Sequence, residues 1–110
     1  MQGLSIPTTR ALAIVRSNTQ VYREHIENAA IVTRVAESHI RFGHFEYFAS
    51  QGQNENVKKL ADFVLKYYMS ELEQGDYLGL FNNAIESTAI MIARWQAQGF
   101  SHVVINTDNM

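Results

Sequence analysis

The sequence contains no cysteine, and only one of its 110 residues is a proline. Without cysteine the chain can form neither a disulfide framework nor a thiolate metal site, which fits a reducing compartment. No apolar run approaches the roughly twenty residues that span a bilayer, and the N-terminus lacks the pattern of a signal peptide. We therefore expect a soluble, cytoplasmic protein that does not act at a membrane.

The chain also lacks an excess of either charge. Nine Lys and Arg residues stand against eleven Asp and Glu residues, which gives a formal net charge of −2. No basic stripe is present, so nucleic acid is not an expected partner. The spacing of His25, His39 and His44 does not favour a zinc site. A single domain of this length is expected to bury about two thirds of the surface of its unfolded chain.

The first third of the sequence has the composition of short β-strands. Apolar, partly β-branched residues at 11–15 are followed by Ser17-Asn18-Thr19, which predicts a turn, and by a second strand at 20–24. Residues 30–36 alternate like a third strand. We predict a small antiparallel sheet of three strands, which needs a helix packed against it to be stable.

Helical patterns follow. Residues 42–48 form a short aromatic segment, which we interpret as packing material. A second helix is expected after the Asn54-Glu55-Asn56 cap, and a third ends near Arg94 and Gly99, a cation and a glycine suited to a helix C-terminus. The fold class is therefore α+β. The apolar stripes of the two longer helices are Val57, Leu60, Ala61, Val64, Leu65, Tyr68 and Leu72, then Phe81, Ile85, Thr88, Ile92 and Trp95.

The last ten residues, 101–110, bring polar and ionisable side chains together after the third helix. Asn106-Thr107-Asp108-Asn109 offers several oxygens within one turn, which suits a hard cation such as Mg²⁺ or a general base. An ordinary polar turn or a frayed terminus explains the same residues, and composition alone favours that explanation.

Arg34 occupies a central strand position on a face otherwise formed by Val32 and Ala36. One interpretation is a salt bridge to Glu24 or Glu27 across the hairpin. The other is a guanidinium directed at phosphate oxygens, which its planar donors match. The residues alone leave both open. Arg10, by contrast, is expected to be a solvated charge at a strand edge.

One spacing is similar to that of protein kinases, whose catalytic loop reads H-R-D-x-x-x-x-N after a long helix. Residues 102–109 read H-V-V-I-N-T-D-N, with Val104 at the position of the kinase Asp and a carboxylate four residues later. Together with IPTTRAL at 6–12, TRVA at 33–36, SHIRFGHF at 38–45 and NTDNM at 106–110, this makes the chain closely resemble the selenoprotein O (YdiU) family. These are pseudokinase-fold enzymes that transfer AMP, and in some accounts UMP, to protein hydroxyls.

The resemblance implies roles for four residues. Arg34 and Arg41, seven residues apart, match the family's nucleotide-phosphate-binding arginines. Asp108 matches the proton acceptor, and Asn109 matches a ligand of Mg²⁺ or Mn²⁺, with ATP as the nucleotide substrate. His102 is expected to buttress the loop. The chain departs from the family pattern at two positions. Glu37 stands in place of the usual proline, and Val103 stands in place of the usual glycine.

The resemblance runs from about residue 4 to the end and covers an internal part of a family member. It implies that residues 1–36 end a small β lobe and that residues 37–110 begin a helical lobe with the catalytic loop. The family's glycine-rich loop, its phosphate-contacting lysine and a second metal-binding aspartate lie outside this stretch. We therefore expect a fragment of an enzyme that transfers AMP from ATP to Ser, Thr or Tyr hydroxyls of proteins, inactive alone. The alternative is a non-catalytic helical interaction module, and a phosphotransferase is disfavoured by Val104.

Overall fold

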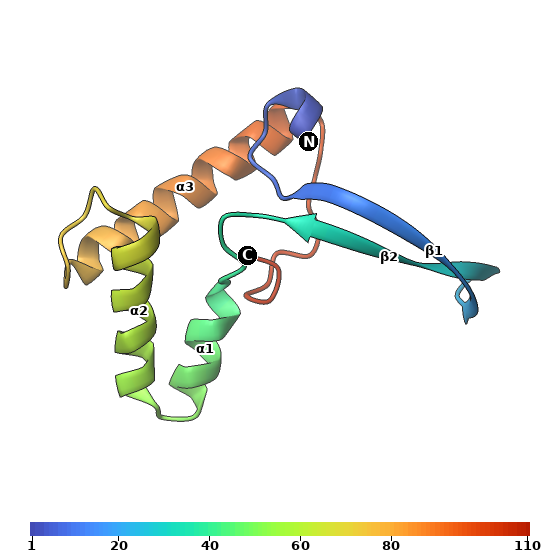
Figure 1. Ribbon diagram of the computed structural model, residues 1–110. Helices are drawn as coiled ribbons and strands as arrows, with labels where there is room; N and C mark the ends of the chain where they lie inside the picture. Colours follow the sequence, from blue (N-terminus) through green and yellow to red (C-terminus); the bar gives the residue numbers. More distant parts are fainter. The chain divides into compact units, whose positions relative to one another are not determined.

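The computed structural model describes residues 1–110, which form two units, Met1–Glu37 and Ser38–Met110. The first unit contains a 3-10 turn, η1 (Gln2–Leu4), and the strands β1 (Arg10–Tyr22) and β2 (Ile26–Val35) (Figure 1). The second contains the helices α1 (Phe42–Ser50), α2 (Asn54–Tyr68) and α3 (Tyr77–Ala97). The α+β class expected from the sequence is confirmed. No helix combines the length and the apolar character that a membrane span requires.

The sheet has two antiparallel strands, so the prediction of three is wrong. Ser17-Asn18-Thr19 lies inside β1, where the register with β2 shifts between Arg16 and Gln20. The Ser17 hydroxyl accepts a hydrogen bond from Thr19 N at 3.0 Å, which satisfies one amide that the irregular pairing leaves free. The reversal comes later, at the bend where Arg23 N donates to His25 O.

The register also bears on Arg34. Arg34 lies opposite Ala11, whereas Glu27 belongs to the same strand as Arg34 and lies opposite Val21. Glu24 falls between the strands, at the bend. The salt-bridge interpretation required one of these carboxylates to face Arg34, and the pairing provides neither. Arg34 is exposed.

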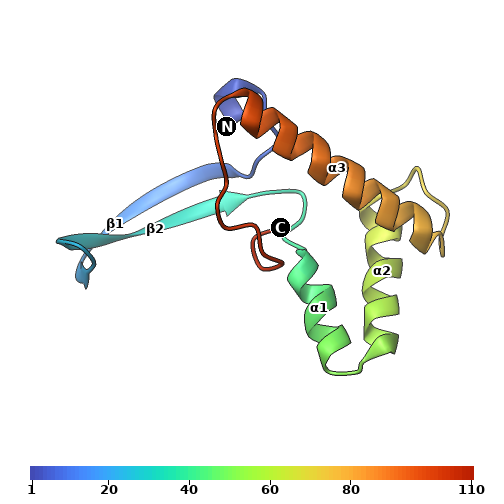
Figure 2. The same ribbon diagram turned by 180° about the vertical axis from the view of Figure 1, so that it is seen from behind.

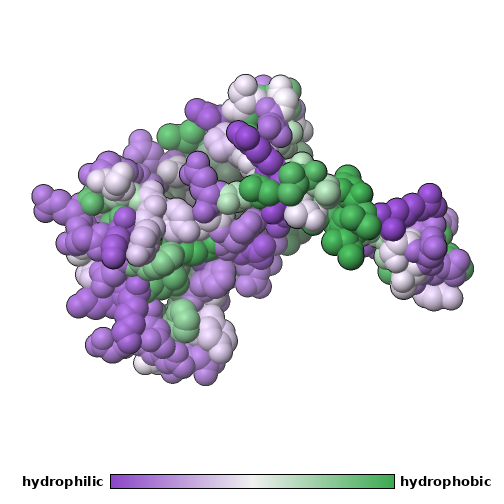
Figure 3. Space-filling model, viewed as in Figure 1, coloured by the Kyte–Doolittle hydropathy of each residue, from purple (hydrophilic) through white to green (hydrophobic).

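Both faces of the hairpin are apolar and exposed. Ile14 pairs with Val32 on one face, and Val15 pairs with Ile31 on the other. Ile14 is 69% exposed and Ile31 is 67% exposed. Figure 3 shows this apolar surface as a green band along the hairpin, with hydrophilic residues at its tip. A two-stranded hairpin is marginally stable at best, and this unit contains no α-helix to cover it.

The core of the second unit is the apolar stripe of α2. Ala61, Val64 and Leu65 are buried, and Leu65 is only 1% exposed, which confirms the predicted stripe there. Leu72 falls outside it because α2 ends at Tyr68. α2 contacts both α1 and α3: in the views of Figures 1 and 2 it runs beside α1, and its C-terminal end meets α3.

The stripe of α3 is less buried than its spacing predicted. Phe81 and Ile85 are exposed, although the helix ends where expected, with Arg94 in its last turn and Gly99 at φ 73°.

Tyr77 joins the start of α3 to α2. Its hydroxyl donates a hydrogen bond to Asp62 Oδ1 at 2.7 Å, and this bond, followed by desolvation and the carboxylate charge, raises the pKa of Tyr77 above 10.0. A raised pKa means that the folded state favours the protonated phenol. The contribution to stability is therefore complete below pH 10 and is lost as the pH rises through the raised pKa.

We expect Tyr77→Phe to lower the Tm at pH 7 and to lose this effect at alkaline pH. The Tm difference from the parent chain should shrink as the pH rises above 10, because the parent's phenol then ionises beside Asp62. The Tm difference is measured by thermal unfolding, monitored by circular dichroism, at several pH values across this range. Tyr22→Phe, at an exposed hairpin tyrosine, is the control. A Tm difference that does not vary with pH would contradict the prediction.

Candidate functional site

The C-terminal loop, residues 101–110, folds back onto the first turn of α1. Phe42 N donates to Met110 O at 2.7 Å, and Gly43 N donates to Thr107 O at 2.7 Å. Amides in the first turn of a helix have no partner within the helix. The loop therefore caps α1, and the helix in turn fixes the path of the loop.

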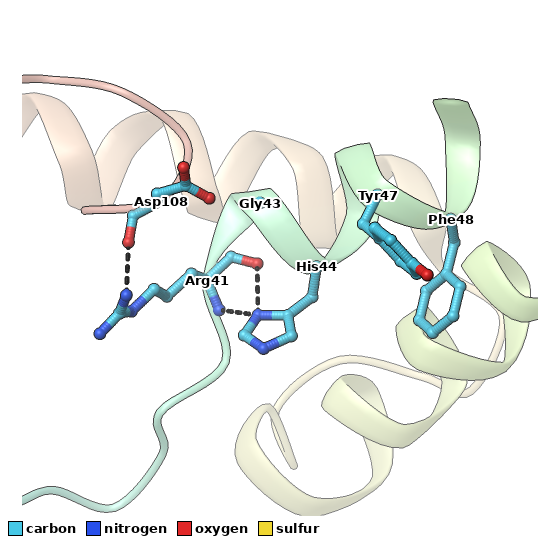
Figure 4. Close-up of a pocket in the computed structure, with 6 residues that line it drawn as sticks. All are labelled: Arg41, Gly43, His44, Tyr47, Phe48 and Asp108. Atoms are coloured by element: carbon cyan, nitrogen blue, oxygen red, sulfur yellow. Dashed lines mark hydrogen bonds between the residues drawn. The ribbon is translucent and has the colours of Figure 1, made fainter. Parts of the chain in front are cut away.

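Arg41, the residue before α1, adds a side-chain contact. Its guanidinium Nη1 donates to Asp108 O at 2.6 Å, joining residues 67 apart in the sequence (Figure 4). Its own backbone is tied to His44: Arg41 N donates to His44 Nδ1 at 3.0 Å, and His44 N donates to Arg41 O at 3.1 Å. Arg41 and Asp108, predicted separately as site residues, are thus brought together.

The turn that carries Asp108 is closed by hydrogen bonds of its own. Asn109 N donates to the carbonyl and to the side-chain Oδ1 of Asn106, each at 3.1 Å. Asn109 Nδ2 donates to Val104 O at 3.3 Å. Thr107 Oγ1 donates to Glu46 Oε2 on α1. Residues 106–109 are therefore an ordered turn docked on a helix, and not a frayed terminus.

A pocket of about 400 Å³ lies beside this turn. It combines a cation, a carboxylate and an imidazole with two aromatic rings, which meet edge to face at 5.6 Å. Such a site can bind an anion at the guanidinium and accept a proton at the carboxylate. Its lining residues are Arg41, Gly43, His44, Tyr47, Phe48 and Asp108 (Figure 4).

Four of these residues, Gly43 and three side chains of α1, were not predicted as site residues from the sequence. His44, Tyr47 and Phe48 were interpreted as packing, yet Tyr47 and His44 are exposed and all three line the pocket. The signal was present, because Arg41 directly precedes the aromatic run. Arg34 lies on β2 in the first unit and does not line the pocket.

His102 sits in an aromatic cluster at the end of α3. Its ring stacks on Trp95 at 5.3 Å and 16°, and Phe100 meets it nearly edge-on at 6.2 Å and 77°. Its Nδ1 is buried and has no hydrogen-bond partner. These contacts suit a residue that supports the loop. Val103 is 89% exposed, so its side chain lies in solvent. The resemblance implies a glycine at this position, and the larger valine is therefore accommodated without contacts in the loop.

Asn109 fits part of a magnesium ligand set, next to the carboxylate of Asp108. Asn109 uses its amide nitrogen on Val104 O, which leaves its amide oxygen available, and Asp108 is exposed. The chain holds no group of three or more His, Cys, Asp or Glu side chains that could bind a metal by itself. Mg²⁺ commonly takes only one or two protein oxygens and completes its shell with water and substrate phosphates. The free amide oxygen of Asn109 is compatible with that mode.

Comparison with known proteins agrees with the motifs. A family model described as "Protein adenylyltransferase SelO" matches residues 1–110. Three curated relatives named "Protein nucleotidyltransferase YdiU", from Erwinia tasmaniensis, Thioalkalivibrio sulfidiphilus and Aeromonas salmonicida, are each 53% identical to the chain. The alignments cover 100% of the chain but 23% of each relative, so the chain spans about a quarter of their length. The chain belongs to the SelO family of protein adenylyltransferases.

Proposed function

We propose that this chain supplies the proton acceptor and part of the phosphate-binding surface of an enzyme that transfers AMP from ATP to Ser, Thr or Tyr hydroxyls of proteins. The observation that carries the proposal is the Arg41–Asp108 contact beside the pocket. The Arg41 guanidinium donates to the backbone carbonyl of Asp108, and both residues line the pocket. A phosphate-binding cation and a proton acceptor from distant parts of the sequence therefore lie at one place.

The proposed reaction is a displacement at the α-phosphorus of ATP. The acceptor hydroxyl oxygen bonds to phosphorus, pyrophosphate leaves, and the hydroxyl proton passes to the Asp108 carboxylate. Arg41 donates one N–H to the Asp108 carbonyl, so four of its five N–H donors remain available to bind phosphate oxygens. Arg34 is the second phosphate contact. Asn109 would hold Mg²⁺ or Mn²⁺ through its amide oxygen, and the bound ion supplies neutralisation of phosphate charge.

In the same proposal, residues 1–36 end the small β lobe of a kinase-like fold. Residues 37–110 begin its helical lobe and contain the catalytic loop. ATP and proteins with accessible hydroxyl side chains are the partners.

A second candidate function is a non-catalytic interaction module. The observation that favours it is the exposed apolar surface of α3, which includes Phe81, Ile85 and Ile90. The two candidates differ in nucleotide binding, because a module without turnover has no need of phosphate-binding arginines. Measuring ATP affinity therefore separates them.

We expect Arg34→Ala and Arg41→Ala each to weaken ATP binding in a full-length family protein that carries this segment. A charge-assisted hydrogen bond contributes about 1.5–3 kcal/mol, so the Kd for ATP should rise roughly 10- to 100-fold. Arg34→Ala should leave the Tm nearly unchanged, because Arg34 is exposed and no acidic residue lies opposite it. Calorimetric titration with Mg-ATP and thermal unfolding measure the two effects.

Arg10→Ala is the matched control, since Arg10 is an exposed arginine at the start of β1 with no assigned role. It should leave both the Kd and the Tm unchanged. A large fall in Tm with intact ATP affinity would instead make Arg34 and Arg41 structural residues, and would favour the interaction module.

A further inference from the structure

The residue before Asp108 is held at two points on α1. Thr107 O accepts a hydrogen bond from Gly43 N at 2.7 Å, and Thr107 Oγ1 donates to Glu46 Oε2. Positions 43 and 46 are three residues apart in the helix and lie on the same side of it. The backbone and the side chain of Thr107 are therefore both anchored to one surface of α1.

Gly43 permits this close approach. A Cβ atom at this position would lie 2.8 Å from Asp108 Oδ1 and 3.0 Å from Thr107 O, so the Asp108 carboxylate would have to turn away and the Thr107 carbonyl would have to shift slightly. Figure 4 shows Asp108 directly beside Gly43 at the start of α1. Gly43 does not have the positive φ found at Gly52, Gly75 and Gly99. Backbone conformation therefore does not require glycine here, but the adjacent turn does.

From these contacts we infer that Gly43 and Glu46 are positioning residues that set the direction of the Asp108 carboxylate, acting through Thr107. The inference rests on the proposed role of Asp108 as proton acceptor. Neither residue touches substrate in this account. Glu46 anchors the Thr107 hydroxyl, and Gly43 leaves space for the Asp108 side chain. Misplacing a reacting group by about 1 Å can reduce a rate roughly 100-fold, so a single lost anchor is measurable.

Because these contacts are exposed, their loss is expected to change turnover rather than global stability. Glu46 and Thr107 are both exposed, so their hydrogen bond contributes little to global stability. Removing it should lower turnover while leaving the Tm and the binding of ATP nearly unchanged. A residue that merely stabilised the fold would lower the Tm first.

The test uses a full-length family protein that carries this segment. Thr107→Val keeps the side-chain shape but removes the hydroxyl, and its kcat for AMP transfer should fall roughly 10- to 100-fold. The KM for ATP and the Kd for Mg-ATP should stay within twofold. Thr107→Ser, which restores the hydroxyl, should recover most of the kcat. Glu46→Ala should match Thr107→Val, and the double variant should lose no more than either single variant.

Gly43→Ala tests the role of Gly43 independently of the Thr107–Glu46 hydrogen bond. Its kcat should fall at least as far as that of Thr107→Val, while its Tm should stay near that of the parent because the added methyl group crowds a turn made of exposed residues. A Tm that falls together with the activity would overturn the inference for Gly43.

Two controls separate this inference from the proposed function. If Asp108→Asn abolishes transfer but Thr107→Val keeps a kcat within twofold of the parent, the positioning inference is wrong and the proposed function stands. If Asp108→Asn keeps near-normal activity, the proposed function itself is wrong. Additive losses in the Glu46→Ala/Thr107→Val double variant would show that the two residues do not act through a shared hydrogen bond.

Discussion

Asp108→Ala and Asp108→Asn should each abolish AMP transfer by a full-length family protein that carries this segment. A positioned general base contributes about 10²- to 10⁴-fold to a rate, and the asparagine amide keeps the shape of the carboxylate but cannot accept the proton. The Arg41 contact is made to the backbone carbonyl of Asp108, so it can persist in both variants. The measurement is the initial rate of AMP incorporation at saturating Mg²⁺ and ATP.

A second substitution asks whether the loop works in the geometry of ordinary kinases. Val104→Asp, placed in the Asp108→Ala background, restores an acid at the position of the kinase base. We expect no rescue, because the reactive phosphorus is oriented for a base four residues further along. The Val104 carbonyl also accepts a hydrogen bond from Asn109 Nδ2 and so helps to hold the turn. Rescue by Val104→Asp would assign the base to that position, and near-normal activity of Asp108→Asn would remove Asp108 from the reaction.

The isolated chain of 110 residues should show no measurable AMP transfer. Stabilising the charge of the transferring phosphate accounts for most of the catalysis in such reactions, and the glycine-rich loop and the lysine that the family resemblance implies for this purpose are expected outside the present stretch. The chain matches only 23% of each full-length relative. Incubation with labelled ATP, Mg²⁺ and an acceptor protein should leave the acceptor unlabelled.

A full-length relative such as the Erwinia tasmaniensis protein is the positive control for that assay. An Asp108→Ala version of the isolated chain controls for contaminating activity. Metal-dependent labelling by the isolated chain that disappears in its Asp108→Ala version would mean that these residues suffice for transfer.

The parts of the fold that could be predicted are those set by local periodicity. The stripe through Ala61, Val64 and Leu65 repeats with the helical period, and these side chains form the core of the second unit. Gly99 ends α3 in the left-handed conformation that its position suggested. The hairpin was misjudged because Ser17-Asn18-Thr19 has turn composition, whereas pairing with β2 keeps this stretch extended as an irregularity of the strand.

In the candidate site, some residues were identified from sequence motifs, whereas the contacts between them were seen only in the structure. The motifs pointed to Arg34, Arg41, Asp108 and Asn109 through resemblance alone, and their roles stay predictions. The contact between Arg41 and Asp108 depends on how three helices fold between them, which no local spacing encodes. Glu46 and Gly43 carried no signal either, because an acid and a glycine within a short aromatic helix are unremarkable until the loop is seen against them.

The docking of residues 101–110 on α1 has a consequence for motion. Joining two points 67 residues apart in a disordered chain costs about 4 kcal/mol of loop-closure entropy, and folded α2 and α3 lower this cost by fixing the path between them. The loop itself is held by hydrogen bonds at exposed residues such as Arg41 and Thr107, whereas α2 is held by its buried stripe. Weakly enclosed contacts open at lower free energy than a core does. The surroundings of Asp108 can therefore open and close while α2 stays folded, and the lifetime of the arranged site is set by the loop and not by the helices.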